Sequence, residues 1–354
     1  MSLTLAGLGW HLMPDLPASD DDHLAADPPL RPARVMEQAP GLWHVHDGEA
    51  VLLARARSRS LTPTPATGDW VLIAGDGADG VLVERVLPRR TVLSRAEAGG
   101  RSAEQVVAAN IDVVAITAPA DAANLRRLER ELTAAWGSGA QPVVLITKVD
   151  LLDDVELVEV LADVRDIAVG ADVVAVSSYD GRGLDEVRAL LGDGLALALV
   201  GPSGVGKSSL VNALAGEEVM ATTELRDDGK GRHTTTSRRL IALPGGGLVM
   251  DTPGMREFAP WSDDGLDEAF ADLAALAEGC RFSDCSHEHE PSCAVREAAE
   301  ADEAVAARLA AWRALQRELA WLERRRDVRL QAAERKRWAA LTREGRARTR
   351  PQTR

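Results

Sequence analysis

The stretch LALALVGPSGVGKSSLVNALAG at residues 195–216 decides the fold of the central part of this chain. It contains the phosphate-binding pattern G-x-x-x-x-G-K-[ST], preceded by an apolar run and followed by a helical sequence. Gly201, Gly204 and Gly206 let the backbone turn so that successive N–H groups point at phosphates, at the positive end of the following helix. A glycine-rich turn that matches by chance is the alternative, and the strand and helix on either side disfavour it. The stretch therefore predicts a nucleoside triphosphate site on an α/β fold.

Predicted phosphate chemistry depends on a few residues in and after this stretch. Lys207 would bridge the β and γ phosphates and act in catalysis, and the Ser208 hydroxyl would be a Mg²⁺ ligand. In LVMDTPG at 248–254, Asp251 would hold Mg²⁺ through water, and Gly254 would offer its N–H to the γ-phosphate. The residues predicted to contact the phosphates are Gly201, Pro202, Ser203, Gly204, Val205, Gly206, Lys207, Ser208, Ser209 and Gly254.

A polar, glycine-containing segment, DDGKGRHTTTSRR at 227–239, lies between these two motifs. One of its threonine hydroxyls would complete the Mg²⁺ shell only while the γ-phosphate is present, which would make the segment a switch. We favour Thr235 for this contact, with Thr234 and Thr236 as alternatives. A threonine-rich segment taken alone is more often an ordinary loop.

The choice of base is predicted from ITKVD at 146–150. Asp150 would accept hydrogen bonds from N1 and the N2 amino group of guanine, and adenine has no matching donors there. Lys148 would lie along the base plane. A second segment, VSSYDGRG at 176–183, would contact guanine O6 through its backbone. The residues predicted to read the base are Thr147, Lys148, Val149, Asp150, Ser177 and Ser178.

The order of the motifs is circularly permuted. Most small GTPases have the phosphate loop first and the base-reading motifs last, whereas here the base-reading motifs precede the loop. Permutation leaves such a site intact, because the motifs lie on loops at one edge of the sheet and only the connections differ. The chain that leaves DTPG then runs directly into the C-terminal part of the protein.

Other elements flank this centre. Residues 31–90 hold five short β-like runs separated by Gly, Pro and Asp, which suggests a small barrel. Beyond residue 104 apolar runs alternate with helical patterns, as in a mostly parallel sheet covered by helices, and VVAANIDVVAIT at 106–117 is a buried-strand run. After Trp261 the strand pattern ends, and amphipathic helices are predicted over 271–279 and 304–325.

A cysteine and histidine cluster lies between these C-terminal helices. Cys280, Cys285, His287 and Cys293 use every cysteine of the chain and suit a closed, structural, tetrahedral Zn²⁺ site. His289 is an alternative to His287 as the fourth ligand, and unrelated buried thiols are the alternative to a metal site.

Bulk composition indicates a cytoplasmic protein that lacks a membrane span. The chain has 45% hydrophobic and 27% charged residues, with no apolar run near the roughly 18 residues that a span requires and no basic secretory leader. The formal charge of −14 argues against coating nucleic acid by charge alone. Residues 321–354, however, contain 12 Arg or Lys and 4 Asp or Glu, so this tail is either a phosphate-binding arm or a solvated terminus.

Taken together, these motifs resemble the RsgA (YjeQ) family of GTPases that act in late maturation of the small ribosomal subunit. The resemblance spans nearly the whole chain and includes GDWV at 68–71, VLPRRTVLSR at 86–95, QVVAANIDVV at 105–114, GPSGVGKSSLVN, GKGRHTTT, DTPGMREF and CRFSDCSHEHEPSC. It implies an OB-fold barrel, GTP turnover stimulated by the small subunit, binding of ribosomal RNA, and His287 as the zinc ligand. We expect a monomer that binds GTP and GDP.

The resemblance also implies domain boundaries. We expect an N-terminal extension over 1–30, an OB-fold over 31–95, a permuted GTPase domain over 96–262, and a zinc-binding helical domain with a basic tail over 263–354.

Two positions depart from common GTPase patterns. Thr147 stands where the family has Asn, and a hydroxyl can make only part of the bridge that ties the base to the phosphate loop, so nucleotide binding could be looser while guanine preference persists through Asp150. Met255 stands where Ras-like enzymes carry a water-orienting glutamine. We therefore assign water positioning to His233 and expect slow intrinsic turnover.

Two other functions fit part of the sequence. A P-loop kinase of a small molecule would share Lys207, Ser208 and Asp251, but it would not need the base-reading segments at 146–150 and 176–183. An RNA-binding module with a purely structural nucleotide site would fit the barrel and the basic tail.

Overall fold

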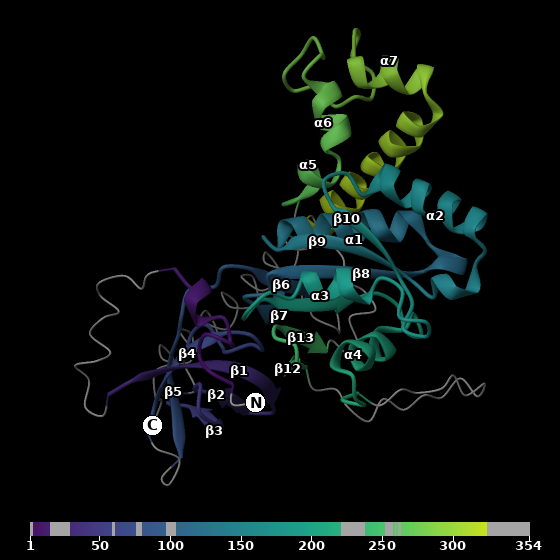
Figure 1. The fold of residues 1–354 in the computed structure, drawn as a ribbon. Coiled ribbons are helices and arrows are strands. Elements are labelled where there is room, and N and C mark those ends of the chain that lie inside the picture. Colours follow the sequence, from purple (N-terminus) through teal and green to yellow (C-terminus); the bar gives the residue numbers. More distant parts are fainter. Residues whose placement is uncertain are drawn as a thin grey trace, which may run out of the picture.

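The protein consists of three parts that follow one another from bottom to top in Figure 1: a β-barrel, a central sheet flanked by helices, and a helical lobe. The structure is a computed structural model. It describes residues 3–14, 29–58, 61–75, 80–96, 104–220, 238–251, 258, 260 and 263–323.

Secondary structure in the described residues follows the order expected from the sequence: strands at the start, alternating strands and helices in the centre, and helices at the end. The strands are β1 (Arg31–Ala39), β2 (Leu42–His46), β3 (Val51–Ala56), β4 (Trp70–Ala74), β5 (Val81–Val86), β6 (Val92–Ala96), β7 (Glu104–Ala109), β8 (Val113–Pro119), β9 (Gln141–Thr147), β10 (Asp172–Val176), β11 (Ala196–Val200), β12 (Arg239–Ala242) and β13 (Leu248–Asp251). The α-helices are α1 (Leu125–Gly137), α2 (Asp154–Ile167), α3 (Leu184–Ala189), α4 (Lys207–Ala215), α5 (Leu266–Ala269), α6 (Ala271–Ala277) and α7 (Ala294–Ala301). Short 3-10 helices are η1 (Trp10–Leu12), η3 (Ala120–Ala122) and η4 (Val149–Leu151), and residues 303–323 form one more α-helix.

The central sheet has the strand order β10-β9-β8-β11-β13-β12. The first five strands run parallel, and β12 is antiparallel to β13. Because side chains alternate between the faces of a strand, Val114 of β8 packs with α1 and α2, whereas Val113 belongs to the core under α3 and α4. Both faces are therefore covered, and the carboxyl ends of the five parallel strands lie at one edge.

The N-terminal strands close into a five-stranded barrel of the OB type, as expected from the sequence. β1 pairs with both β2 and β4, and the ring is completed by β2–β3, β3–β5 and β4–β5 pairings. Val35, Val45, Val71 and Val83 fill its interior. β1 also pairs with β12, at Glu37 and Arg239, so the barrel and the central sheet are hydrogen-bonded to each other.

The run at 106–117 forms two strands, so the expectation of a single buried strand is wrong. Asn110 interrupts the run with φ 54°, a left-handed conformation that ends a strand. β7 before it pairs with β6, whereas β8 after it joins the parallel sheet. The Asn110 side chain is buried, accepts from the Arg90 N–H at 2.9 Å and donates to the Gly68 carbonyl at 3.2 Å. The apolar run alone does not reveal this turn, because the residues that bind the Asn110 side chain are distant in sequence.

Residues 3–14 pack in the angle between the barrel and the central sheet. Leu8 is fully buried, and its carbonyl accepts a hydrogen bond from the buried Arg34 of β1. Burial lowers the pKa of Arg34 to about 10. A Cβ on Gly9 would lie only 2.5 Å from the carbonyl oxygen of Gly194, just before β11, so this approach requires glycine.

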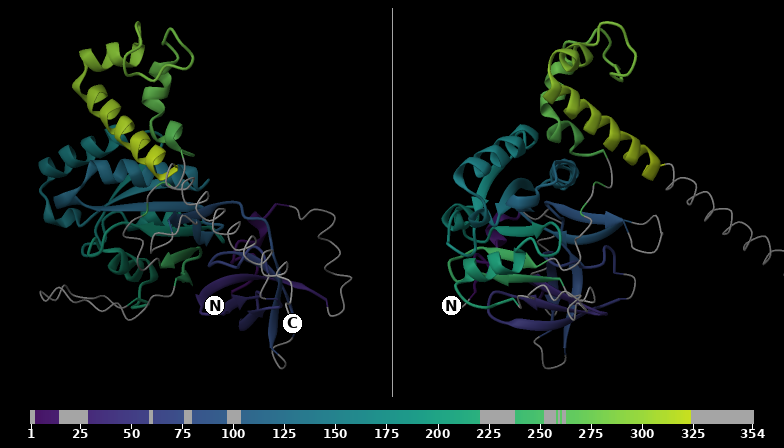
Figure 2. Two further views of the ribbon diagram at one scale, coloured as in Figure 1. Left: turned by 180° about the vertical axis from the view of Figure 1, so that it is seen from behind. Right: turned by 90° about the vertical axis from the view of Figure 1, so that its right-hand side faces the viewer.

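The helical lobe docks on α1. A Cβ on Gly265 would lie 2.2 Å from the backbone nitrogen of Gly137, so the two main chains meet where α1 ends and α5 begins. In Figure 2 the helix over 303–323 runs from the lobe back toward the central domain. It contacts α1 there, where Arg130 and Glu318 form an ion pair at 2.6 Å.

Arg308 of this last helix forms a buried junction with α1 and α6. Its guanidinium donates to Glu129 at 2.9 Å and to Asp272 at 2.7 Å, and it lies 4.3 Å from the Phe270 ring centroid. Burial raises the pKa of Glu129, and the nearby Arg308 charge partly offsets this rise. The junction fixes the lobe on the helix that follows β8.

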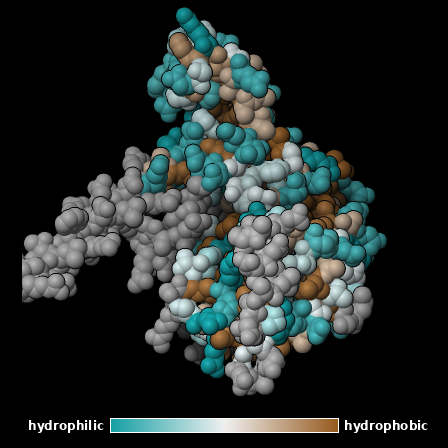
Figure 3. Space-filling view, turned by 90° about the vertical axis from the view of Figure 1, so that its left-hand side faces the viewer, coloured by the Kyte–Doolittle hydropathy of each residue, from teal (hydrophilic) through white to brown (hydrophobic). Residues whose placement is uncertain are grey.

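Within the described residues, no helix is both long and apolar enough to cross a membrane. On the face drawn in Figure 3, hydrophobic residues form separate patches between hydrophilic ones.

Candidate functional site

The phosphate loop connects β11 to α4 at the carboxyl edge of the sheet. Gly201, Gly204 and Gly206 all have positive φ, at 136°, 78° and 101°, which residues with a Cβ rarely adopt. A Cβ on Gly201 would lie 2.3 Å from the hydroxyl of Thr117 on β8. Gly206 is the N-cap of α4, so the free amides of the first turn face the loop. The backbone thus has the form that the sequence predicts for binding phosphates.

Lys207 and Ser208 occupy the first turn of α4. The Lys207 ammonium donates to the carbonyls of Gly201 at 2.8 Å and Pro202 at 2.6 Å, so it lies across the loop. Ser208 is half-buried. A cation beside the N-terminus of a helix attracts anions.

Thr147 joins the end of β9 to this loop. Its hydroxyl lies 2.7 Å from the carbonyl oxygen of Val205 and 3.2 Å from that of Ala118, and the side chain is buried. A hydroxyl has one hydrogen, so it can donate to only one of the two carbonyls at a time, and Val205 is the nearer. The base-reading segment and the phosphate loop are therefore in direct contact.

Lys148 and Asp150 follow at the turn after β9. Lys148 is the N-cap of η4 and has φ 59°. This left-handed conformation costs free energy for a residue with a side chain, and such residues cluster at functional sites. Val149 is fully buried and anchors the turn, whereas Asp150 is exposed.

Ser177, after β10, holds Asp150 in place. Its buried hydroxyl donates to Asp150 Oδ1 at 2.6 Å and accepts from the Tyr179 N–H at 3.1 Å. One carboxylate oxygen is thereby fixed, and the other remains for a ligand. Ser178 beside it is half-buried.

The topology brings these segments together. β9, β8 and β11 are neighbours in the sheet, and β10 lies beside β9. Thr147 is the last residue of β9, and Ser177 and Gly201 directly follow β10 and β11. Ligands of open α/β sheets bind at this edge, so the arrangement suits one nucleotide that spans the base-reading and phosphate-binding segments.

Part of the predicted site lies outside the described residues: His233, Thr234, Thr235, Thr236, Gly254 and Met255. Asp251 is the last residue of β13, which pairs in parallel with β11. Its main chain therefore ends at the same edge as the phosphate loop.

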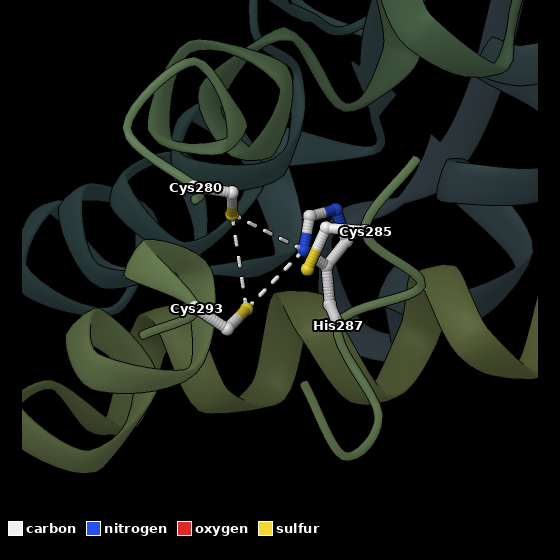
Figure 4. A group of neighbouring side chains, drawn as sticks. All are labelled: Cys280, Cys285, His287 and Cys293. Carbon is white, nitrogen blue, oxygen red and sulfur yellow. Dashed lines mark hydrogen bonds between the residues drawn. The ribbon is translucent and has the colours of Figure 1, made fainter. Parts of the chain in front are cut away.

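A second cluster lies in the helical lobe, where four side chains converge (Figure 4). The ligand atoms of Cys280, Cys285, His287 and Cys293 all lie within 4.8 Å of one another. A tetrahedral zinc ion requires edges of about 3.8 Å between sulfurs and about 3.5 Å between sulfur and nitrogen. The Cys280–Cys293 sulfurs are 3.8 Å apart, and His287 Nδ1 lies 3.6 and 3.3 Å from those two sulfurs. The group fits a structural zinc ion.

The histidine of the cluster is prepared to coordinate a metal through Nδ1. Burial lowers the pKa of His287, which favours the neutral ring that binds metals. His287 has φ 59°, and its carbonyl accepts a hydrogen bond from Arg313 of the last helix. The alternative histidine, His289, is not among the four clustered side chains.

Other residues beside the phosphate loop were not identified from the sequence. The Thr117 hydroxyl donates to the Val200 carbonyl at 2.6 Å, and Arg127 donates to the Thr117 carbonyl at 2.9 Å. Glu131, one turn beyond Arg127, is buried, and burial raises its pKa to about 7. The available signal was weak: Glu131 follows Leu128 by three residues, so it falls on the apolar face of a predicted helix.

Comparison with known proteins agrees with this architecture. The RsgA GTPase family model matches residues 86–261. The small ribosomal subunit biogenesis GTPase RsgA of Streptomyces coelicolor is 44% identical over 317 residues, covering 87% of this chain and 85% of that protein. The protein of the same name from Opitutus terrae is 41% identical over 98% of both chains. The crystal structure of YjeQ from Thermotoga maritima superimposes with a TM-score of 0.64 and 27% identity, over 82% of this chain and 99% of that one. The chain belongs to the RsgA GTPase family and is a circularly permuted enzyme that hydrolyses GTP.

Proposed function

We propose that this GTPase acts in late maturation of the small ribosomal subunit and that the subunit stimulates its GTP hydrolysis. The names of its relatives support the subunit as the partner. The hydrogen bond between Thr147 and Val205 is the observation that best supports the nucleotide part of the proposal, because the segment at 146–150 and the loop at 201–206 meet there.

Each part of this site has a distinct role in the proposal. Asp150, oriented by Ser177, reads guanine, and Lys207 with the loop amides binds the phosphates of GTP or GDP. Ser208, Thr235 and Asp251 hold Mg²⁺, which neutralises charge that develops on the phosphates. Gly254 senses the γ-phosphate, and His233 positions the attacking water.

In the same proposal, Cys280, Cys285, His287 and Cys293 hold one structural Zn²⁺. The distances among Cys280, His287 and Cys293 match a tetrahedral zinc site, and Cys285 lies within 4.8 Å of all three. The segment 280–293 has few buried apolar residues of its own. The metal would therefore maintain the loop against the last helix rather than take part in hydrolysis.

Contacts to ribosomal RNA would be made chiefly to phosphates and RNA shape. The chain is poor in aromatic residues, at 3%, so base stacking contributes little. The basic tail over 321–354 supplies phosphate-binding charge in this proposal. We further propose that the protein works as a cytoplasmic monomer with the four domains delimited by sequence.

Two alternative functions are less well supported. A small-molecule kinase would not need a serine that orients Asp150, as Ser177 does here. A purely structural nucleotide site is at odds with membership of a GTPase family.

The deciding experiment measures GTP and ATP hydrolysis with and without purified small subunits. Slow GTP hydrolysis, accelerated by the subunit and absent with ATP, is expected. Hydrolysis of both nucleotides at equal rates, or a GTPase rate that subunits leave unchanged, would contradict the proposal.

A further inference from the structure

An ion pair on α1 between the half-buried Arg127 and the buried Glu131 lies next to the phosphate loop but belongs to none of the nucleotide motifs. Glu131 is 1% exposed, and its Oε2 lies 3.4 Å from Arg127 Nε, one helical turn earlier. That oxygen has no hydrogen-bond partner in the part of the chain that the structure describes. Such a carboxylate is costly to bury. Arg127 is its nearest counter-charge.

Arg127 connects this pair to the loop through one intermediate residue. Its Nη2 donates to the carbonyl of Thr117, at 2.9 Å. The Thr117 hydroxyl in turn donates to the carbonyl of Val200, the residue before Gly201. A Cβ on Gly201 would lie 2.6 Å from the Thr117 carbonyl oxygen, so the strand end and the loop are in van der Waals contact.

We infer that Arg127 and Glu131 are a positioning pair for the phosphate loop. Arg127 fixes the end of β8 against Gly201, and Glu131 fixes Arg127. Neither residue needs to touch the nucleotide. The pair sets nucleotide affinity by holding the first residue of the loop in the conformation that aims its amides at the phosphates.

Other charges near Glu131 act more weakly. Lys207 on α4 and Arg130 on α1 both favour its ionised form, but the Arg127 charge has the larger effect on its pKa. Arg130 is already paired with Glu318 of the last helix. Glu131 therefore influences the loop mainly through Arg127, which it holds in position.

Affinity for a fluorescent N-methylanthraniloyl GDP tests the pair through Arg127→Met, Glu131→Gln and the double variant. We expect Arg127→Met to weaken binding about fivefold to tenfold, since a buried carbonyl loses a charge-assisted hydrogen bond. At pH 8, where Glu131 is mostly ionised, Glu131→Gln should weaken binding about twofold to threefold. The double variant should match Arg127→Met alone, because Glu131 acts through Arg127. In GTP hydrolysis the KM should rise by similar factors, and the turnover number should change less than the KM.

Arg126→Met is the matched control, since it removes the same charge from an exposed neighbouring position of α1 and should bind like the wild type. Wild-type affinity in Arg127→Met, or effects that add up in the double variant, would overturn the inference. Tighter binding in Glu131→Gln would also overturn it, because the carboxylate would then act on the phosphates by direct repulsion. Glu131→Gln keeps the shape of the side chain, so its folding is not in doubt.

Discussion

Replacing the buried carboxyl group of Glu131 by an amide should change how stability depends on pH. Burial raises the pKa of Glu131 from its ordinary value of 4.5 to about 7. Between these values the folded protein keeps a proton that the unfolded chain has lost, so this group favours folding at acid pH and the benefit disappears as pH rises through about 7. Between pH 5 and pH 8 the loss of stability amounts to roughly 2 to 3 kcal/mol for such a pair of pKa values.

Glu131→Gln removes this proton and leaves the other titrating groups in place. Urea unfolding of the nucleotide-free protein, followed by circular dichroism at pH 5 and pH 8, gives the free energy of unfolding for both proteins. Relative to the wild type, we expect the free energy of unfolding of the variant to rise by roughly 2 to 3 kcal/mol from pH 5 to pH 8. Glu159→Gln, which changes an exposed glutamate of α2, should follow the wild type at both. An equal difference between wild type and Glu131→Gln at pH 5 and pH 8 would refute the reasoning.

Three further predictions concern the sites themselves. Thr147→Val removes the donor to the Val205 carbonyl and should weaken GDP binding about fivefold, as measured by nucleotide titration; unchanged affinity would show that the bridge contributes nothing. Asp150→Asn should exchange GTP for XTP as the preferred substrate in hydrolysis assays, since xanthine presents a carbonyl where guanine has an amino group; retained GTP preference would exclude Asp150 as the base reader. His287→Ala should lose bound zinc in metal analysis whereas His289→Ala should keep it, and the reverse pattern would reassign the ligand.

Much of the site could be predicted because it depends on local patterns at strand ends. The loop at 201–206 carries its own glycines, and ITKVD follows an apolar strand. Parallel strands bring their carboxyl ends to one edge, which is why motifs from distant parts of the chain could be expected in one site. The partner of the Thr147 hydroxyl could not be foreseen, since it depends on which loop atom lies within 3 Å or so of β9.

Features that depend on contacts between distant segments were not predictable. Asn110 is as polar as many loop residues, and only its bonds to Arg90 and Gly68 show why the run breaks there. In the sequence Arg308 is one of many arginines in predicted helices, although in the structure it joins three helices. Local periodicity contains no information about such partners.

The position of β12 has a mechanical consequence. This short strand begins directly after the threonine-rich segment, and it is hydrogen-bonded to β13 on one side and to β1 on the other. The Thr67 hydroxyl adds a bond to the Arg238 carbonyl at 3.2 Å. Movement of the barrel would therefore be transmitted through these hydrogen bonds to the strand that follows residues 227–238. A large assembly that binds the barrel would thereby also constrain Arg238 and Arg239, which begin the next described stretch of the chain.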